Sequence, residues 1–220
     1  MKKIILLLTS ILCVFTLQKQ LKASANEINS NTVIEKQLTN LFEGLPDNKL
    51  VVVYPDGSIS YTNNVVADYP QELLNEEHAK IMDVSSAKQS VKNILSQPTY
   101  ETRQTSPGWS ARKLKAGETY RSQRFSGKGW RFSGYSFYPA LGTGPYLFFR
   151  SIGDDGRVGN YNDAMNLVMR GQLTGKALMA KDGWKYFFVG DSIVSANNAL
   201  GYYTYNPKPG TVYEVHNWNI

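Results

Sequence analysis

The chain of 220 residues is long enough for one domain, or for one domain and a smaller companion. It carries 24 basic and 18 acidic residues, a formal net charge of +6, and 42% of its residues are hydrophobic, which excludes wholesale disorder. One cysteine excludes a disulfide framework and a four-cysteine metal centre, and two histidines leave little room for a histidine-rich one.

Residues 1–25 are predicted to be a cleaved secretory signal peptide. Two N-terminal lysines precede the apolar run Ile4–Leu17, and Ala23-Ser24-Ala25 forms a small-residue cleavage pattern. The apolar run is shorter than a membrane-spanning helix, although an uncleaved anchor is the alternative. Because Leu12 precedes Cys13, a lipoprotein box is not expected. The mature protein would then be extracellular and free of cysteine, as is common for proteins exported by Gram-positive bacteria.

Charge and composition divide the rest of the chain into two segments. Residues 26–105 hold 11 acids, 6 bases and two glycines, whereas residues 106–220 hold 7 acids, 14 bases, the other 16 glycines and 21 of the 27 aromatic residues. The boundary near residues 97–108 is rich in proline, threonine, serine and glycine, which is typical of a linker. We therefore expect an acidic pro-region or companion domain at 26–105, in contact with a basic domain at 106–220.

The acidic segment is predicted to be a small α+β unit. A capping box of Thr32 and Glu35 begins a helix that Gly44 can end. Apolar runs at 50–54 and 58–61, on either side of a Pro-Asp-Gly turn, predict a hairpin. Two more helices are expected, from Pro70 to about Met82 and from Ser85 to Leu95.

The basic segment is predicted to be an all-β domain, either a sandwich or a jelly-roll-like fold. Its apolar runs are short, rich in aromatic residues and separated by glycine turns. The large residues change from even to odd positions at Ser133-Gly134, which predicts a bulge, and Lys181-Asp182-Gly183 predicts a tight hairpin turn. The candidate strands are 119–125, 130–138, 146–152, 167–173, 177–180, 184–189, 201–205 and 212–217.

Cations and aromatic residues interleave at the start of the basic segment and form the main candidate binding site. Its predicted members are Trp109, Arg112, Lys113, Lys115, Arg121, Arg124, Lys128, Trp130 and Arg131. This mixture suits an anionic cell-wall polymer, a membrane surface or an acidic glycan. The alternative is that the cations form the solvated faces of the first two strands. Nucleic acid would also suit the pattern, but it is a poor physiological partner for an exported protein.

Calcium is the one cofactor that the sequence suggests. Asp154, Asp155, Asn160 and Asp163 lie in a glycine-rich stretch that could supply oxygen ligands. Their spacing does not match an EF-hand loop, and the same residues are what ordinary turns need.

Catalytic motifs are absent from the sequence, so no catalytic residue is assigned. It has no phosphate-binding loop, no dinucleotide fingerprint and no H-E-x-x-H motif. The remaining possibilities are an acid pair, Glu118 with Glu214, and the single histidine of the basic segment, His216.

Three functional hypotheses follow from these features. The favoured one is a secreted protein whose basic aromatic β-domain binds an anionic cell-surface polymer or membrane, with an antibacterial or toxin-like activity as a consequence. The alternative is a secreted module that binds neutral glycans through exposed tryptophan and tyrosine. A secreted hydrolase is the third.

Overall fold

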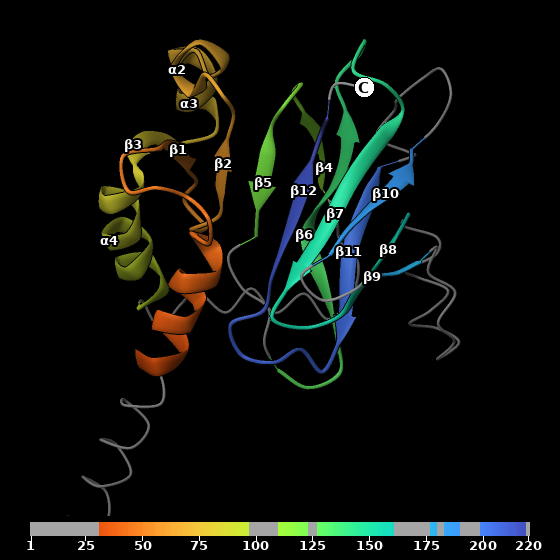
Figure 1. The fold of residues 1–220 in the computed structure, drawn as a ribbon. Helices are drawn as coiled ribbons and strands as arrows, with labels where there is room; N and C mark the ends of the chain where they lie inside the picture. The colour runs from red at the N-terminus through yellow and green to blue at the C-terminus, as the bar shows by residue number, and fades with distance from the viewer. Residues whose placement is uncertain are drawn as a thin grey trace, which may run out of the picture.

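The computed structural model describes residues 31–96, 110–122, 127–160, 177–179, 183–189 and 199–218. Within them the chain is mostly β-strand, arranged in two sheets with a few short helices (Figure 1). The predicted signal peptide, the predicted linker and the candidate strand 167–173 lie outside these residues. None of the described helices has the length and apolar character that a membrane crossing requires.

The acidic segment folds as α+β, with a helix at residues 31–41. The predicted hairpin is confirmed as β1 (Leu50–Val53) and β2 (Ile59–Tyr61), and the predicted last helix as α4 (Val84–Leu95). Two short helices, α2 (Val65–Asp68) and α3 (Gln71–Glu76), follow the hairpin.

The predicted helix from Pro70 to Met82 is wrong in its second half. The helix α3 ends at Glu76, and His78 adopts a positive φ of 51° that turns the chain away from the helix. Residues Lys80–Asp83 then form β3, which pairs with β1 along four residues. The open edge of β1 offers these residues backbone partners, and this tertiary pairing outweighs their local helical pattern.

The basic segment supplies nine of the described strands. Strands β6, β7, β9, β10, β11 and β12 confirm predicted strands to within one or two residues, whereas β4 and β8 had not been predicted. The strands are β4 (Ser110–Leu114), β5 (Thr119–Arg121), β6 (Trp130–Pro139), β7 (Tyr146–Ile152), β8 (Gly156–Gly159), β9 (Ala177–Met179), β10 (Trp184–Phe188), β11 (Leu200–Tyr205) and β12 (Val212–His216).

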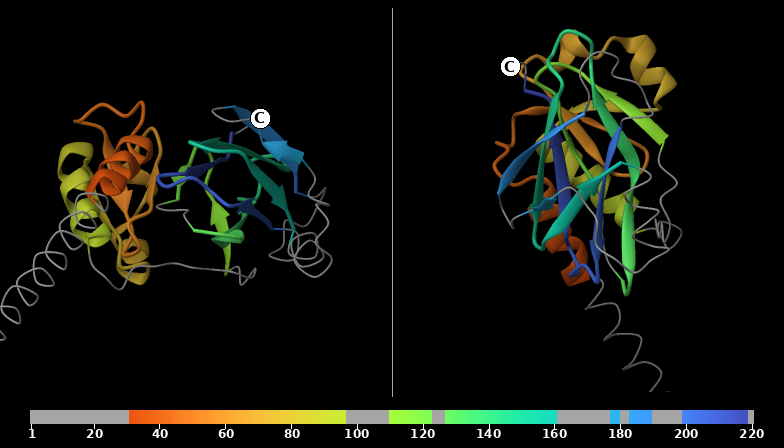
Figure 2. Two further views of the ribbon diagram at one scale, coloured as in Figure 1. Left: turned by 90° about the horizontal axis from the view of Figure 1, so that it is seen from below. Right: turned by 90° about the vertical axis from the view of Figure 1, so that its right-hand side faces the viewer.

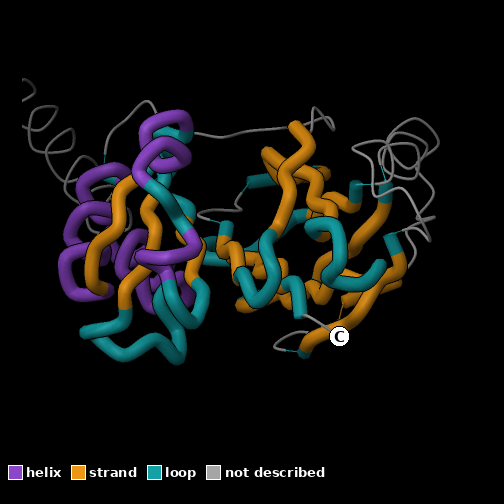
Figure 3. Tube along the Cα trace, turned by 90° about the horizontal axis from the view of Figure 1, so that it is seen from above, coloured by secondary structure: helices purple, strands orange, loops and turns teal. Residues whose placement is uncertain are grey.

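The strands form a seven-stranded sheet, β10-β7-β12-β5-β2-β1-β3, and a five-stranded sheet, β4-β6-β11-β8-β9. The predicted hairpin at 181–183 is wrong, because β9 and β10 belong to different sheets. The larger sheet contains strands of both segments, since β2 pairs with β5 in the register Ile59↔Arg121, Ser60↔Tyr120 and Tyr61↔Thr119. Figure 3 shows the helices at the end of the molecule where this sheet begins, and the remaining strands beyond them.

The predicted bulge in β6 is confirmed. Against β11, Ser136 lies opposite Gly201 and Phe132 opposite Tyr203, so the register shifts between the two pairs. The hydroxyl of Ser133 bridges the irregular region, because it accepts a hydrogen bond from the Tyr202 amide at 3.0 Å and donates one to the Tyr135 carbonyl at 2.7 Å. A side chain thus satisfies backbone groups that the shifted ladder leaves unpaired.

Two hydrophobic cores hold the elements together. In the first, aromatic rings of the two sheets pack on one another, with Tyr202 of β11 stacked on Tyr213 of β12 at a centroid distance of 4.7 Å. This core also contains Val52 and Tyr54 of the acidic segment. The second core lies between the helix at 31–41, α4 and the outer face of β1 and β2, at the helical end of the molecule in Figure 2.

A buried ion-pair network fastens the basic segment to the first helix. Glu214 of β12 is fully buried and pairs with both Arg121 of β5 and Arg150 of β7. The Nη1 atom of Arg121 also donates to the carbonyls of Leu41 and Glu43, at 2.7 and 2.8 Å. Arg121 therefore neutralises a buried carboxylate and satisfies carbonyls at the end of the helix.

Replacing Glu214 with glutamine should lower the free energy of unfolding by about 3–5 kcal/mol, because two arginines would lose their common buried counter-ion. Urea denaturation measures the change. The control is Lys88→Gln, which breaks the exposed Lys88–Asp47 pair and should cost less than about 1 kcal/mol. Losses of similar size in the two variants would contradict the assigned role of Glu214.

Candidate functional site

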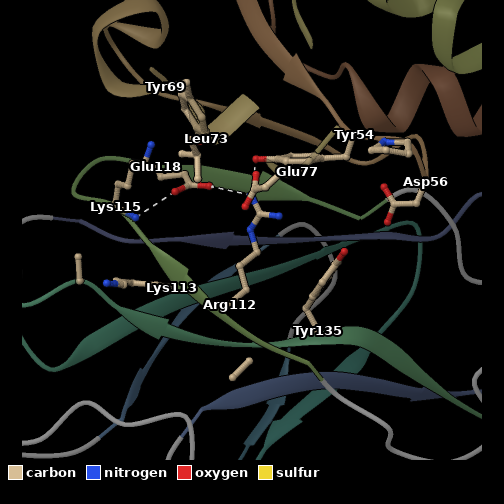
Figure 4. Close-up of a pocket in the computed structure, with 13 residues that line it drawn as sticks. Tyr54, Asp56, Tyr69, Leu73, Glu77, Arg112, Lys113, Lys115, Glu118 and Tyr135 are labelled. Atoms are coloured by element: carbon tan, nitrogen blue, oxygen red, sulfur yellow. Dashed lines mark hydrogen bonds and ion pairs between the residues drawn. The ribbon is translucent and has the colours of Figure 1, made fainter. Parts of the chain in front are cut away.

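A cavity of about 840 Å³ lies where the acidic and basic segments meet (Figure 4). Its size suits a small ligand or one unit of a polymer. The hairpin β1–β2, the region of α2 and α3, the strands β4 and β6 and the turn before β5 all contribute to its wall. The lining residues are Tyr54, Pro55, Asp56, Tyr69, Leu73, Glu77, Ala111, Arg112, Lys113, Lys115, Glu118, Tyr135 and Ala140.

Arg112 occupies the centre of the cavity. It extends from β4, at the edge of the five-stranded sheet, towards the acidic segment (Figure 4). Its guanidinium lies 4.3 Å from the ring centroid of Tyr54 and 5.2 Å from that of Tyr120, and it donates a hydrogen bond to the Tyr54 hydroxyl. The aromatic faces stabilise a cation that is largely removed from water.

Two carboxylates face the same nitrogen of Arg112 without binding it tightly. The Nη2 atom lies 3.6 Å from Glu118 and 3.7 Å from Glu77, whereas a direct charge-assisted hydrogen bond is about 2.7–2.9 Å long. Burial acts to lower the pKa of Arg112, but Tyr54 and the two carboxylates outweigh it and raise that pKa. Arg112 therefore stays charged, and its buried Nε has no hydrogen-bond partner in the described part of the chain.

Glu118 is held rigidly in the wall. Its Oε1 accepts a hydrogen bond from the Ser60 hydroxyl at 2.9 Å, and its Oε2 accepts one from the Lys115 amide, also at 2.9 Å. Ser60 lies opposite Tyr120 in the sheet, whereas Glu214 lies opposite Arg121. Since neighbouring residues of a strand point to opposite faces, the side chains of Glu118 and Glu214 lie on different faces, and the predicted acid pair between them is wrong.

Tyr69 and Lys115 form the wall beside Glu118. The Nζ atom of Lys115 lies 3.8 Å from the Tyr69 ring centroid and donates to the carbonyl of Asp68. The buried Tyr69 hydroxyl makes no hydrogen bond of normal geometry with a described residue. Burial, and secondarily the carboxylate of Glu118, raise the pKa of Tyr69, so the hydroxyl keeps its proton and can donate to a ligand.

The structure divides the predicted cluster of cations and aromatic residues. Arg112 and Lys115 line the cavity, whereas Lys113 lies at its rim, where it is exposed and, as the neighbour of Arg112 along β4, points to the other face of the strand. Arg121 is only 3% exposed and is committed to Glu214, so a surface ligand cannot reach it.

The other members of the predicted cluster lie elsewhere. Trp130 and Arg131 begin β6, at its opposite end, where Trp130 packs on Tyr203 and Tyr205, and Lys128 lies two residues before that strand. Trp109 and Arg124 lie outside the described residues.

Sequence reasoning missed the half of the cavity that the acidic segment supplies. Tyr54 and Glu77 are 58 and 35 positions from Arg112, and no local motif links them to it. They reach Arg112 only because β2 pairs with β5.

Part of the proposed calcium stretch is accounted for by hydrogen bonds and packing. The carboxylate of Asp154 accepts from the amides of Asp155 and Lys208, each at 3.0 Å, and so orders a turn. A Cβ atom on Gly156 would lie 2.1 Å from the Tyr202 ring, which requires glycine there. Asp163 lies outside the described residues, and within them no three His, Cys, Asp or Glu side chains are grouped to hold a metal. The calcium site stays a prediction.

No family model, curated protein sequence or solved structure matches this chain. The site is therefore interpreted from its own chemistry. It combines tyrosine faces, a buried but loosely paired arginine, a tyrosine hydroxyl that keeps its proton and two further lysines. This arrangement can bind a polar ligand, but it does not by itself supply a nucleophile with its base.

His216 lies on the other face of the seven-stranded sheet, away from the cavity. Its Nδ1 lies 2.6 Å from the Thr119 hydroxyl, and its buried Nε2 has no partner among the described residues. The rings of Trp218 and Trp184 pack around it, at centroid distances of 5.1 and 6.1 Å. Burial lowers the pKa of His216 to about 4, although Glu214 opposes the shift.

The depressed pKa of His216 predicts a loss of stability in mild acid. Between about pH 6.5 and pH 4 this histidine is protonated in the unfolded chain but stays neutral in the folded protein. The free energy of unfolding therefore decreases as the pH is lowered through this range. Urea denaturation along a pH series should show a weaker fall for His216→Gln than for the wild type. The exposed His78 provides the control, His78→Asn, which should keep the wild-type slope. An unchanged slope in His216→Gln would contradict this role.

Proposed function

We propose that this is an exported protein that binds an anionic glycan, with one sugar unit held in the cavity around Arg112. The supporting observation is that Arg112 and Lys115 line a single cavity with Tyr54, Tyr69 and Tyr135, and that Lys113 lies at its rim. The predicted signal peptide at 1–25 and a sandwich arrangement of the β-domain are parts of this proposal.

The spacing around Arg112 favours a ligand with hydroxyl groups. The guanidinium of Arg112 and the carboxylate of Glu77 are 3.7 Å apart, too far for a direct hydrogen bond, so a ligand hydroxyl beside them could accept from the first and donate to the second. The Arg112 Nε and the Tyr69 hydroxyl, which have no hydrogen bond of normal geometry with a described residue, add two donors for ligand oxygens. The tyrosine faces would pack against the C–H faces of a sugar ring.

The lysines favour an anionic group on that sugar. Glu118 and Glu77 already balance the charge of Arg112. Asp56 is engaged in its own turn, where it accepts from the amide and hydroxyl of Ser58. Lys113 and Lys115 are therefore the cations best placed to meet a carboxylate or a phosphate. A flat membrane surface would not enter such a cavity, so a discrete saccharide unit suits it better.

Isothermal titration calorimetry should detect binding of trigalacturonate or mannose 6-phosphate and much weaker binding of neutral maltotriose. The first two probes separate a carboxylate ligand from a phosphate ligand. Lys113→Gln should weaken binding about two- to fivefold, and Tyr69→Phe, which removes one donor, by a similar factor. The control Lys80→Gln removes an exposed lysine from β3 and should leave the affinity unchanged.

Equal affinity for the three probes, or an affinity that does not fall with added salt, would contradict the anionic part of the proposal. If Lys113→Gln and Tyr69→Phe both bind with unchanged affinity, the ligand does not bind in this cavity.

We further propose that residues 26–105 stay with the basic segment in the working protein, rather than leaving as a pro-region. They supply β1, β2 and β3 to the seven-stranded sheet and Tyr54, Tyr69 and Glu77 to the cavity. Their removal would expose one edge of β5 and part of the shared core.

Mass spectrometry of secreted material should therefore find one main species that begins near Asn26 and contains the basic segment, because 26–105 is needed to complete the fold. Native mass spectrometry extends the test to a chain that has been cut between residues 103 and 115. The two fragments should remain associated. A folded fragment that lacks residues 26–105 and still binds the glycan would instead support the hypothesis that these residues are a pro-region.

A further inference from the structure

A group of aromatic side chains lies on the face of the seven-stranded sheet opposite the cavity. Its members come from β7, from β10 and from the residue two positions after β12, and they form one connected series of ring contacts with centroid distances of 4.2–6.2 Å. We call it the aromatic surface; it consists of Tyr146, Phe148, Trp184, Tyr186, Phe188 and Trp218.

Strand register places these side chains on one face. Thr119, His216, Phe148 and Tyr186 lie opposite one another in turn across β5, β12, β7 and β10. The same face is covered by the helix at 31–41 and by α4 over β1 and β2, at the helical end of the molecule (Figure 2). At the other end of the sheet four of the six rings are exposed to solvent.

The exposure of the aromatic surface is unusual. Tyr186 is 70% exposed, Trp218 45%, Phe188 42% and Tyr146 37%, and they account for half of the eight exposed large hydrophobic residues in the described part of the chain. Single exposed apolar residues are ordinary, but a contiguous group of rings marks an interaction surface.

The aromatic surface carries no free charge among the described residues. Arg150 packs 5.1 Å from the Trp184 ring centroid, but its guanidinium is paired with buried Glu214. Lys185 alternates with Trp184 and Tyr186 along β10, so its side chain points to the opposite face. Among the described residues, the aromatic surface has no unpaired cation that could bind an anionic polymer or an anionic lipid. An uncharged partner can bind there without removing a charged group from water.

We propose that the aromatic surface binds a neutral polysaccharide, whose sugar rings stack on Tyr186 and Trp218. The rings of Tyr146 and Tyr186 are inclined at 78° and those of Tyr146 and Phe188 at 61°, so the surface is ridged rather than flat. Such a surface fits the sides of a single soluble chain better than the plane of a crystalline one. The tyrosine hydroxyls would supply hydrogen bonds to sugar oxygens at its edge. This site is independent of the cavity around Arg112.

Affinity electrophoresis in gels that contain soluble β-glucan, xylan or galactomannan tests the proposal with the full chain. The wild type should be retarded by at least one of these polymers, and the retardation should persist in high salt. Tyr186→Ala and Trp218→Ala should each weaken binding about tenfold. Tyr205→Ala is the matched control, because Tyr205 is 58% exposed but belongs to the five-stranded sheet.

Tyr186 is the more informative of the two positions, because it is the more exposed and its truncation leaves the Phe148–Trp218 contact of 4.2 Å intact. The Lys113→Gln variant should keep its retardation, which separates this site from the cavity. Absence of retardation by all three polymers, or equal retardation of Tyr186→Ala, Trp218→Ala and the wild type, would overturn the proposal. If the protein binds neutral phosphatidylcholine vesicles and none of the three polysaccharides retards it, the aromatic surface binds a membrane instead, and the proposal is overturned.

Discussion

Three residue pairs between β2 and β5, with Ser60 opposite Tyr120 at their centre, carry the larger sheet across the boundary between the two segments. On one face of this junction Arg121 reaches the end of the first helix and pairs with Glu214. On the other face Ser60 orients Glu118, which in turn faces Arg112. The anchoring of the helix and the shape of the cavity therefore both depend on a short stretch of strand pairing.

Ion pairs between the acidic and the basic segment balance part of their opposite charges. Arg112 of the basic segment faces Glu77 of the acidic segment at 3.7 Å, and Arg150 lies 3.9 Å from Glu43. Buried arginines need such partners, because an uncompensated charge in the interior is costly. The cations left near the surface of the cavity are lysines, whose compact charge is strongly hydrated and carried on a flexible side chain.

The two faces of the larger sheet separate two kinds of chemistry. One face contributes paired charges and hydroxyl groups to the cavity, whereas the opposite face, beyond the helices and the ion pairs of Glu214, carries exposed aromatic rings. This separation follows from the alternation of side chains along each strand, since Phe148 and Phe149 of β7 serve the aromatic surface and the core respectively. One sheet would in this way carry both proposed sites, the one for an anionic sugar and the one for a neutral polysaccharide.

Local pattern in the sequence determined most of the strands, the hairpin around Asp56, the helix α4 and the bulge beside Ser133, because turn chemistry and hydrophobic period act over a few residues. It also identified Arg112, Lys113 and Lys115 as members of a candidate binding site. Only the tertiary structure decided that Lys80–Asp83 is a strand, that Arg121 is buried, that Glu118 and Glu214 are separated by a sheet, and that Tyr54 and Tyr69 complete the cavity. These outcomes depend on pairing between residues far apart in the chain, and the free energy of that pairing is not contained in any local window of sequence.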